Sequence, residues 1–152
     1  MGNKSKLDET DFAILRHLKQ NSRMRFLEMS RQMQVPDATI QSRVKRLEKR
    51  GIIEKFTITV NPAAIGFTVA AIMLVQLDAD NQDTVKIALS KIPEISEIYG
   101  VLGEYDLCIK VWSRSLEELN DLINDKIRSI EGIEDLLEIV IVERVKEDSV
   151  PI

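Results

Sequence analysis

Cysteine and histidine each occur only once in this sequence, as Cys108 and His17. One cysteine excludes an intramolecular disulfide, and no cluster of cysteine and histidine exists that would bind a structural zinc ion. His17 falls within a predicted helix, where it is expected at the surface or between helices. Cys108 falls within a predicted strand, where it is expected to be a buried, small apolar residue. This scarcity predicts a protein of a reducing compartment, without a metal site.

Motifs of catalysis are missing as well. The sequence has no glycine-rich phosphate loop, no metal-ligand spacing and no nucleophile elbow. A ferredoxin-like domain elsewhere in nature can carry catalysis, but a fold alone does not assign function. We therefore predict that the protein is not an enzyme, has no catalytic residues and uses no cofactor.

Long hydrophobic runs are also missing. The longest, Val69–Val75, is much shorter than the stretch of about 20 residues that a membrane-spanning helix needs. The N-terminal sequence MGNKSKLDET lacks the apolar segment of a secretory signal peptide. A cytoplasmic protein with no membrane partner is expected.

Charge is present in quantity but unevenly divided. The formal net charge is -4, yet residues 1–60 hold 13 Lys/Arg against 7 Asp/Glu, a net of +6. The other 8 basic and 18 acidic residues lie in 61–152, which gives that part a net of -10. Phosphates attract a basic module and repel an acidic one, so only the N-terminal part is expected to contact nucleic acid.

Three helices are predicted in the N-terminal part from apolar residues at helical spacing. The first covers residues 8–20, with Asp8 as its N-cap and with Glu9 and Asp11 favoured at its positive end. Gly51 ends the third. The apolar positions that mark the three helices are Ile14, Leu15 and Leu18; Phe26, Leu27, Met29 and Met33; and Ile40, Val44 and Leu47.

The second and third of these helices lie within residues 21–53 and flank a tight turn, which is typical of a helix-turn-helix. Because Ile40, Val44 and Leu47 must face the core, the opposite side of the third helix is polar and basic. The N-terminal part of such a helix reads base edges of DNA. The alternative is an ordinary solvated amphipathic helix. The predicted DNA-binding residues are Thr39, Gln41, Ser42 and Arg46 for base edges, Lys45, Lys49 and Arg23 for phosphates, and Arg43 on the same helix.

Beyond the third helix the apolar spacing becomes that of a half-buried strand, since Phe56, Ile58 and Val60 alternate with polar residues. A proline and a glycine then mark a linker between the two charge regions. The predicted parts are a winged-helix-like helix-turn-helix domain at 1–60, the linker at 61–67 and a second domain at 68–152.

The second domain is predicted to have the element order β-α-β-β-α-β. This order is typical of a ferredoxin-like α+β fold, in which two helices cover one face of an antiparallel sheet. The predicted elements are a strand at 68–79, a helix at 82–92, strands at 94–102 and 105–113, a helix at 115–130 with Leu116, Leu119, Ile123, Ile127 and Ile130 inward, and a strand at 134–145.

Both sides of the last predicted strand are largely apolar. Leu136 and Val140 point one way, whereas Leu137, Ile139 and Ile141 point the other. The two helices cover only one side, and the other would leave a larger apolar patch than a soluble monomer normally exposes. A homodimer that pairs through the sheet is therefore expected.

Several short motifs are shared with one known family. They are Leu7-Asp8 with Asp11, Ile14-Leu15 and Leu18; Asn21 and Arg23; Arg43-Val44-Lys45-Arg46-Leu47-Glu48 running into Gly51-Ile52-Ile53; Asn61-Pro62 and Gly66; and Gly103-Glu104-Tyr105-Asp106. On these residues the chain resembles the Lrp/AsnC, or feast/famine, family of prokaryotic transcription regulators over nearly its whole length. The resemblance implies a helix-turn-helix domain followed by a ferredoxin-like oligomerisation and effector-binding domain.

Three residues around the predicted turn depart from that family. Ser30, Gln34 and Pro36 stand where it usually has Ala, Gly and Ser. The usual glycine accepts a left-handed conformation, which Gln34 is expected to adopt at some cost. Either Pro36 lies in the first helical turn with Asp37 beside it at the positive dipole end, or Asp37 itself is the N-cap.

The resemblance also implies a small-molecule site. In the family, the turn that corresponds to residues 103–106 lines a pocket between dimers, where the charged groups of an amino acid meet backbone groups and an acidic side chain. Asp106 would then accept the ammonium group. The alternative is an ordinary hairpin turn. The implied effector-binding residues are Val101, Leu102, Gly103, Glu104, Tyr105 and Asp106, with Ile139 and Val140 from another subunit.

These features together predict a sequence-specific transcription regulator that binds double-stranded DNA. Its assembly or its DNA binding would change with an amino acid or a similar metabolite. A homodimer, assembling further to a tetramer or an octamer, would set the spacing of the DNA-binding domains. The alternative is a chromosome-organising protein that wraps DNA with weak sequence preference and has no effector.

Overall fold

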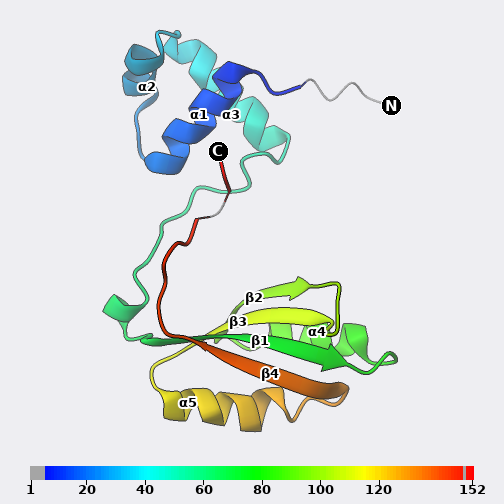
Figure 1. Cartoon of the computed structure of the whole chain (residues 1–152). Helices are drawn as coiled ribbons and strands as arrows, with labels where there is room; N and C mark the ends of the chain where they lie inside the picture. The colour runs from blue at the N-terminus through cyan, green and yellow to red at the C-terminus, as the bar shows by residue number, and fades with distance from the viewer. Residues whose placement is uncertain (1–5, 149) are drawn as a thin grey trace. The chain divides into compact units, whose positions relative to one another are not determined.

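Two compact units make up the chain in the computed structural model, which describes residues 6–148 and 150–152 (Figure 1). The first unit ends at Thr59 and also takes in the C-terminal residues from Asp148, whereas the second is Val60–Glu147. Within the first unit, Lys19 pairs with Asp148 at 2.9 Å and donates to the carbonyl of Val150. No helix among the described residues has the length and apolar character that crossing a membrane requires. Residues 1–5, half of the N-terminal sequence considered above, lie outside the described residues.

The first unit is a three-helix domain built from α1 (Glu9–Gln20), α2 (Phe26–Met33) and α3 (Asp37–Lys49). The prediction of three helices is confirmed. Leu27 is the exception among the expected apolar positions, because its side chain is exposed rather than packed. The buried residues of this core are Ile14, Leu18, Met29, Ile40, Val44 and Leu47.

Asp8 caps α1, as predicted. Its Oδ1 accepts the backbone N–H of Asp11 at 2.9 Å, and Asp11 Oδ2 accepts the backbone N–H of Asp8 at 3.2 Å. This reciprocal pair is a capping box, which satisfies two donors that the first helical turn leaves free.

The turn between α2 and α3 uses a left-handed glutamine. Gln34 has φ 55° and ψ 37°, the conformation expected of it. Asp37 lies in the first turn of α3 beside Pro36, at the positive end of the helix, as the first alternative expected. The position of Pro36 differs from both alternatives, because Pro36 itself occupies the N-cap position and Asp37 is the first helical residue. Pro36 needs no side-chain hydrogen bond there, since its carbonyl accepts the N–H of Thr39 at 3.0 Å and so closes the first turn.

Gly51 ends α3 as predicted, with φ 68°. Its N–H donates to the carbonyl of Glu48, and the N–H of Ile52 donates to that of Leu47, each at 2.9 Å. This is the Schellman pattern, in which a left-handed glycine lets the chain turn back onto the last helical carbonyls. Ile52 then packs against the helical core.

The strand predicted from the alternation of Phe56, Ile58 and Val60 does not form within this chain. Residues 54–60 belong to no sheet, and these three side chains are exposed. A strand requires a hydrogen-bonded neighbour, and none of the described residues provides one here. The prediction was therefore wrong for the isolated chain.

The second unit has the predicted order β-α-β-β-α-β and an antiparallel sheet with strand order β2-β3-β1-β4. A short 3-10 turn, η1 (Ala63–Ile65), precedes the first strand of this unit, and a π-helical turn, η2 (Leu122–Ile127), continues α5. The elements are β1 (Val69–Leu77), α4 (Gln82–Ser90), β2 (Ile95–Gly100), β3 (Leu107–Ser113), α5 (Leu116–Asp121) and β4 (Ile133–Ile141).

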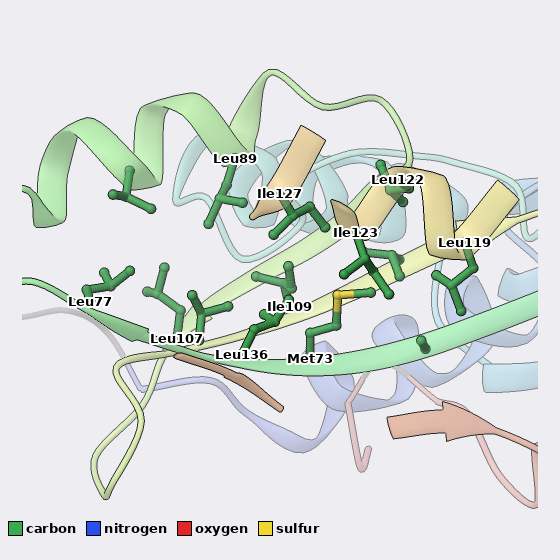
Figure 2. Close-up of a cluster of buried hydrophobic side chains, with 14 residues drawn as sticks. Met73, Leu77, Leu89, Leu107, Ile109, Leu119, Leu122, Ile123, Ile127 and Leu136 are labelled. Atoms are coloured by element: carbon green, nitrogen blue, oxygen red, sulfur yellow. The ribbon is translucent and has the colours of Figure 1, made fainter. Parts of the chain in front are cut away.

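The helix α4 and the helix formed by α5 and η2 cover the same face of the sheet. Figure 2 shows Leu89 of α4, Leu119 of α5 and residues of η2 directed toward strand residues such as Met73 and Ile109. Leu116, which was expected to face inward, is exposed because it begins α5 ahead of this packing surface. The α+β prediction is confirmed.

The other face of the sheet carries no helix. Cys108 lies between the buried Leu107 and Ile109, so it points to this helix-free face and is only half-buried. The expectation that it would be buried was wrong. β4 also ends at Ile141 rather than at residue 145, because Ile141 already pairs with Ala70 at the start of β1.

Candidate DNA-binding and effector sites

The outer side of α3 is open to solvent. Lys45 and Lys49 lie there and form no ion pair with any other residue that the structure describes. Arg23, before α2, is exposed too, and its backbone N–H donates to Asn21 Oδ1 at 3.0 Å. The exposed residues of the predicted set on α3 are Thr39, Gln41, Ser42, Lys45, Arg46 and Lys49. The exposure expected from the apolar spacing is confirmed, whereas contact with DNA stays a prediction.

Two arginines of α3 are bound to carboxylates of α1. Arg43 Nη1 lies 2.6 Å from each carboxylate oxygen of Asp8 and 3.0 Å from Asp11 Oδ1. Arg46 Nη2 lies 2.7 Å from Asp11 Oδ1 and 2.8 Å from Asp11 Oδ2. We call Asp8, Asp11, Arg43 and Arg46 the α1–α3 ion cluster. It joins the first helix to the candidate recognition helix.

Burial differs sharply within the α1–α3 ion cluster. Asp11 is fully buried, whereas half of the Asp8 side chain is accessible. The Arg43 guanidinium, helped by the backbone N–H of Asp11, lowers the pKa of the Asp8 carboxyl below its ordinary value. Asp8 in turn raises the pKa of Arg43. A buried carboxylate needs this pairing, since an uncompensated charge in the interior is costly.

The sequence analysis included Arg43 and Arg46 among the DNA-binding residues and did not predict their carboxylate partners, Asp8 and Asp11. Both pairs have the spacing i, i+3, which puts two residues on the same side of a helix. That signal shows which side each pair occupies but not which two helices meet. The side chain of Arg46 remains 44% exposed, so the cluster does not remove it from the surface.

The candidate effector turn connects β2 to β3 and packs against β1. The N–H of Asp106 donates to the carbonyl of Val75 at 3.0 Å, and Asp106 Oδ2 accepts the N–H of Leu77 at 2.8 Å. The hydroxyl of Tyr105 donates a hydrogen bond to Asp135 Oδ2 of β4 at 3.4 Å. One oxygen of Asp106 is thus used to fix the turn. The exposed part of the turn is Val101, Leu102, Gly103 and Glu104.

Ile139 and Val140 do not join this turn within one chain. They pair with Ile72 and Ala71, whereas the turn is anchored further along β1 at Val75. Because side chains alternate along a strand, Ile139 lies on the helix-free face and Val140 on the opposite one. About two-fifths of each side chain is accessible. The two predicted groups could meet only between chains.

The helix-free face contains a groove of about 670 Å³ that sequence reasoning did not predict. Lys110 lies in it, pairs with Glu147 and with Glu97 at 3.5 Å, and stands 5.3 Å from the centre of the Trp112 ring. Glu147, as acceptor of its hydrogen bond, raises the pKa of Lys110. Among the described residues no group of three histidine, cysteine or acidic side chains is arranged to bind a metal ion.

Two family models match this arrangement of a helical unit and a sheet unit. The winged helix-turn-helix DNA-binding model matches residues 7–54, and the Lrp/AsnC ligand binding domain model matches residues 70–151. The chain belongs to the Lrp/AsnC family of transcriptional regulators. Members of the Lrp/AsnC family are regulators rather than enzymes, so the resemblance and the prediction of no enzymatic activity are confirmed.

Relatives support the Lrp/AsnC assignment over most of the chain. The HTH-type transcriptional regulator FL11 of Pyrococcus furiosus is 38% identical over 128 residues, which cover 84% of each protein. The structure of AsnC from E. coli is similar with a TM-score of 0.91 and 27% identity, over 95% of this chain and 98% of that one.

A further solved structure bears on ligands of the Lrp/AsnC family. It is a feast or famine regulatory protein from M. tuberculosis complexed with L-methionine. Its TM-score is 0.87 at 28% identity, over 94% of this chain and 97% of that chain. A helix-turn-helix regulator with an Lrp/AsnC ligand-binding domain is therefore the class to which this protein belongs.

Proposed function

We propose that this regulator binds specific sites on double-stranded DNA through the outer side of α3. The observation that supports this most is the pairing pattern on α3, where Lys45 and Lys49 are exposed and unpaired among the described residues. Free lysines suit phosphate contacts, because each one that neutralises a phosphate releases a condensed counterion. Thr39, Gln41 and Ser42 stand at the N-terminal end of the helix, from which base edges are read.

A gel-shift titration tests this proposal. The full-length chain and a Lys45→Ala, Lys49→Ala variant are compared on the protein's own promoter and on random DNA at the same salt concentration. We expect the wild type to prefer the promoter by about a thousandfold or more, and the variant to bind both DNAs more weakly. Unchanged binding by the variant would remove α3 from the interface. Equal affinity of the wild type for both DNAs would favour a DNA-wrapping protein instead.

The proposed effector is an amino acid that binds at the 101–106 turn. Support comes from the relative complexed with L-methionine and from the ligand-binding domain match. Asp106 keeps one carboxylate oxygen beyond the bond to Leu77, and this oxygen would accept the ammonium group. The backbone groups around Gly103 would meet the carboxylate, with Ile139 and Val140 of another subunit as apolar lining.

A thermal-shift screen tests the effector. A ligand that binds only the folded state raises the melting temperature with the logarithm of its concentration. We expect at least one of the twenty amino acids, L-methionine being the first to try, to produce such a shift in the wild type. Asp106→Asn should lose the shift, although its amide oxygen can still accept the N–H of Leu77. A screen without any shift would contradict the proposal.

We also infer that two chains pair through the helix-free face. Leu137 and Ile139 are each more than two-fifths exposed there, beside the half-buried Leu74. The segment 54–60 adds a second apolar row, whose Phe56, Ile58 and Val60 are exposed and pair with no strand in the part of the chain that the structure describes. A second copy would cover both and bring two α3 helices to one DNA site. Assembly of such dimers to a tetramer or an octamer remains part of this proposal.

A further inference from the structure

We propose that Asp11 is a positioning residue for DNA recognition, because it fixes the setting of α3 through Arg43 and Arg46. The proposal rests on the proposed function, in which the outer side of α3 contacts DNA. Asp11 itself is fully buried and touches no DNA in this arrangement. Its effect on binding would be transmitted only by the two arginines.

The carboxylate of Asp11 is completely used. Its Oδ1 accepts from Arg43 and from Arg46, and its Oδ2 accepts from Arg46 and from the backbone N–H of Asp8. A carboxylate accepts about four hydrogen bonds in all, so no site remains for water or for another partner. This fixed, buried group lies in the first turn of α1, which the capping box holds in place.

Three hydrogen bonds from two arginines of α3 to Asp11 add a directional constraint that the apolar core lacks. Ile40, Val44 and Leu47 pack by dispersion and by the hydrophobic effect, which have little directional preference. Arg43 and Arg46 lie about one turn apart on α3, and charge-assisted hydrogen bonds are directional. Holding both to one carboxylate limits rotation of α3 about its axis and sliding along it. Lys45 lies between them in sequence, so its direction depends on the same setting.

The sign of the expected effect separates positioning from simple electrostatics. Asp11→Asn removes one negative charge from a DNA-binding unit, and long-range electrostatics alone would then strengthen binding to every DNA sequence. Loss of positioning weakens only the contacts that depend on geometry, which are those to base edges. The ratio of specific to non-specific affinity therefore reports positioning, whatever happens to the charge.

The test compares Asp11→Asn with Glu9→Gln in the full-length chain. Glu9 is also on the first turn of α1 and carries the same charge, but it is exposed and pairs with Arg16 at 2.6 Å, away from α3. Affinities are measured for the site that the wild type selects from a random-sequence pool and for an unselected sequence. We expect Asp11→Asn to lower the ratio about tenfold, equivalent to about 1.4 kcal/mol, and Glu9→Gln to leave it unchanged.

A double-mutant cycle tests whether Asp11 affects DNA binding through Arg46. If Asp11 acts through Arg46, then Asp11→Asn lowers the ratio much less in an Arg46→Gln background than in the wild type. Circular dichroism at the binding temperature checks that each variant is folded. Should Asp11→Asn not fold, Asp11→Glu replaces it, because glutamate keeps the charge but its longer side chain moves the carboxylate away from the position that both arginines share. It too is expected to lower the ratio while leaving non-specific affinity in place.

Two outcomes would overturn the inference. One is a ratio in Asp11→Asn, or in Asp11→Glu if that variant is used, equal to that of Glu9→Gln. The other is full additivity in the cycle. Failure of the proposed function looks different, since the Lys45→Ala, Lys49→Ala variant would then bind DNA like the wild type, or the wild type would select no site.

Discussion

Asp8 combines two roles that one substitution can separate. Its Oδ1 caps α1 by accepting the N–H of Asp11, and its charge pairs with Arg43. Asparagine is as good an N-cap as aspartate but carries no charge. Asp8→Asn therefore keeps the helix start and removes the ion pair.

The lowered pKa of Asp8 predicts a pH-dependent stability. A carboxyl whose pKa is lower in the folded state stabilises the fold above its unfolded pKa, and the contribution is lost as pH falls through the folded pKa. We expect Asp8→Asn to melt at a lower temperature than the wild type at neutral pH, with the gap closing toward about pH 3. Calorimetric melting across this range measures it. A gap that stays constant with pH would show that Arg43 does not stabilise the charged form.

Lys49 provides a prediction on salt dependence. If it contacts a phosphate, Lys49→Ala should reduce the slope of log affinity against log salt concentration by about 0.9. Titrations at several salt concentrations measure the slope. Lys91→Ala is the matched control, since Lys91 is an exposed lysine of the acidic second unit. Equal slopes for Lys49→Ala and the wild type would mean that Lys49 meets no phosphate.

At the scale of elements, the turn between α2 and α3 is strained at one residue. Gln34 has a left-handed conformation that a side chain disfavours. Its N–H and that of Val35 both donate to the carbonyl of Ser30, so the conformation is fixed by the end of α2. The strain therefore belongs to the geometry of the turn and cannot relax without opening it.

Gln34→Gly is expected to stabilise the protein. Glycine removes the left-handed strain but gains freedom in the unfolded chain, which leaves a net increase of up to about 1 kcal/mol in the free energy of unfolding. Urea denaturation measures the change. Gln34→Ala, which shortens the side chain but keeps its Cβ, should show no such gain. If the glycine variant were no more stable than the alanine variant, the left-handed conformation of Gln34 would not be a source of strain.

At the scale of the whole molecule, the uneven distribution of charge agrees with the proposal that one unit binds DNA and the other forms the dimer. The basic unit carries α3, and the acidic unit carries the helix-free face and the candidate effector turn. Repulsion from phosphates keeps an acidic unit off DNA, which leaves its sheet free to pair. Dimerisation and DNA binding would then use different surfaces.

Leu74→Glu tests the pairing of two chains. Leu74 lies on the helix-free face between Cys108 and Leu137, where a charge would be buried in the proposed dimer. We expect this variant to sediment as a monomer at concentrations where the wild type sediments as a dimer or a larger assembly. Ile87→Glu, at an exposed position of α4, should behave as the wild type does. A Leu74→Glu variant that still forms the wild-type assembly would exclude this face.

Local physics explains why so much of the fold was predictable. Among the described residues, helical and alternating apolar spacing located the α-helices α1 to α5 and the four sheet strands but not the short turn η1, and Asp8 and Gly51 marked two helix ends from their own side-chain and backbone preferences. The same spacing showed which side of α3 is exposed. Each of these features depends on residues that are close in sequence, so the amino-acid sequence alone is sufficient to predict them.

Long-range contact decided the rest. The alternation around Ile58 met the local requirements of a strand, yet none of residues 6–148 and 150–152 pairs with it to complete a ladder. The register of β4 on β1 decided that Ile139 and the candidate effector turn lie apart in one chain. Arg43 and Arg46 had the spacing of a DNA-contacting row, and only the packing of α1 against α3 brought Asp11 between them. Hydrogen bonds and ion pairs act over a few ångströms, so they exist only where the tertiary fold brings distant residues together.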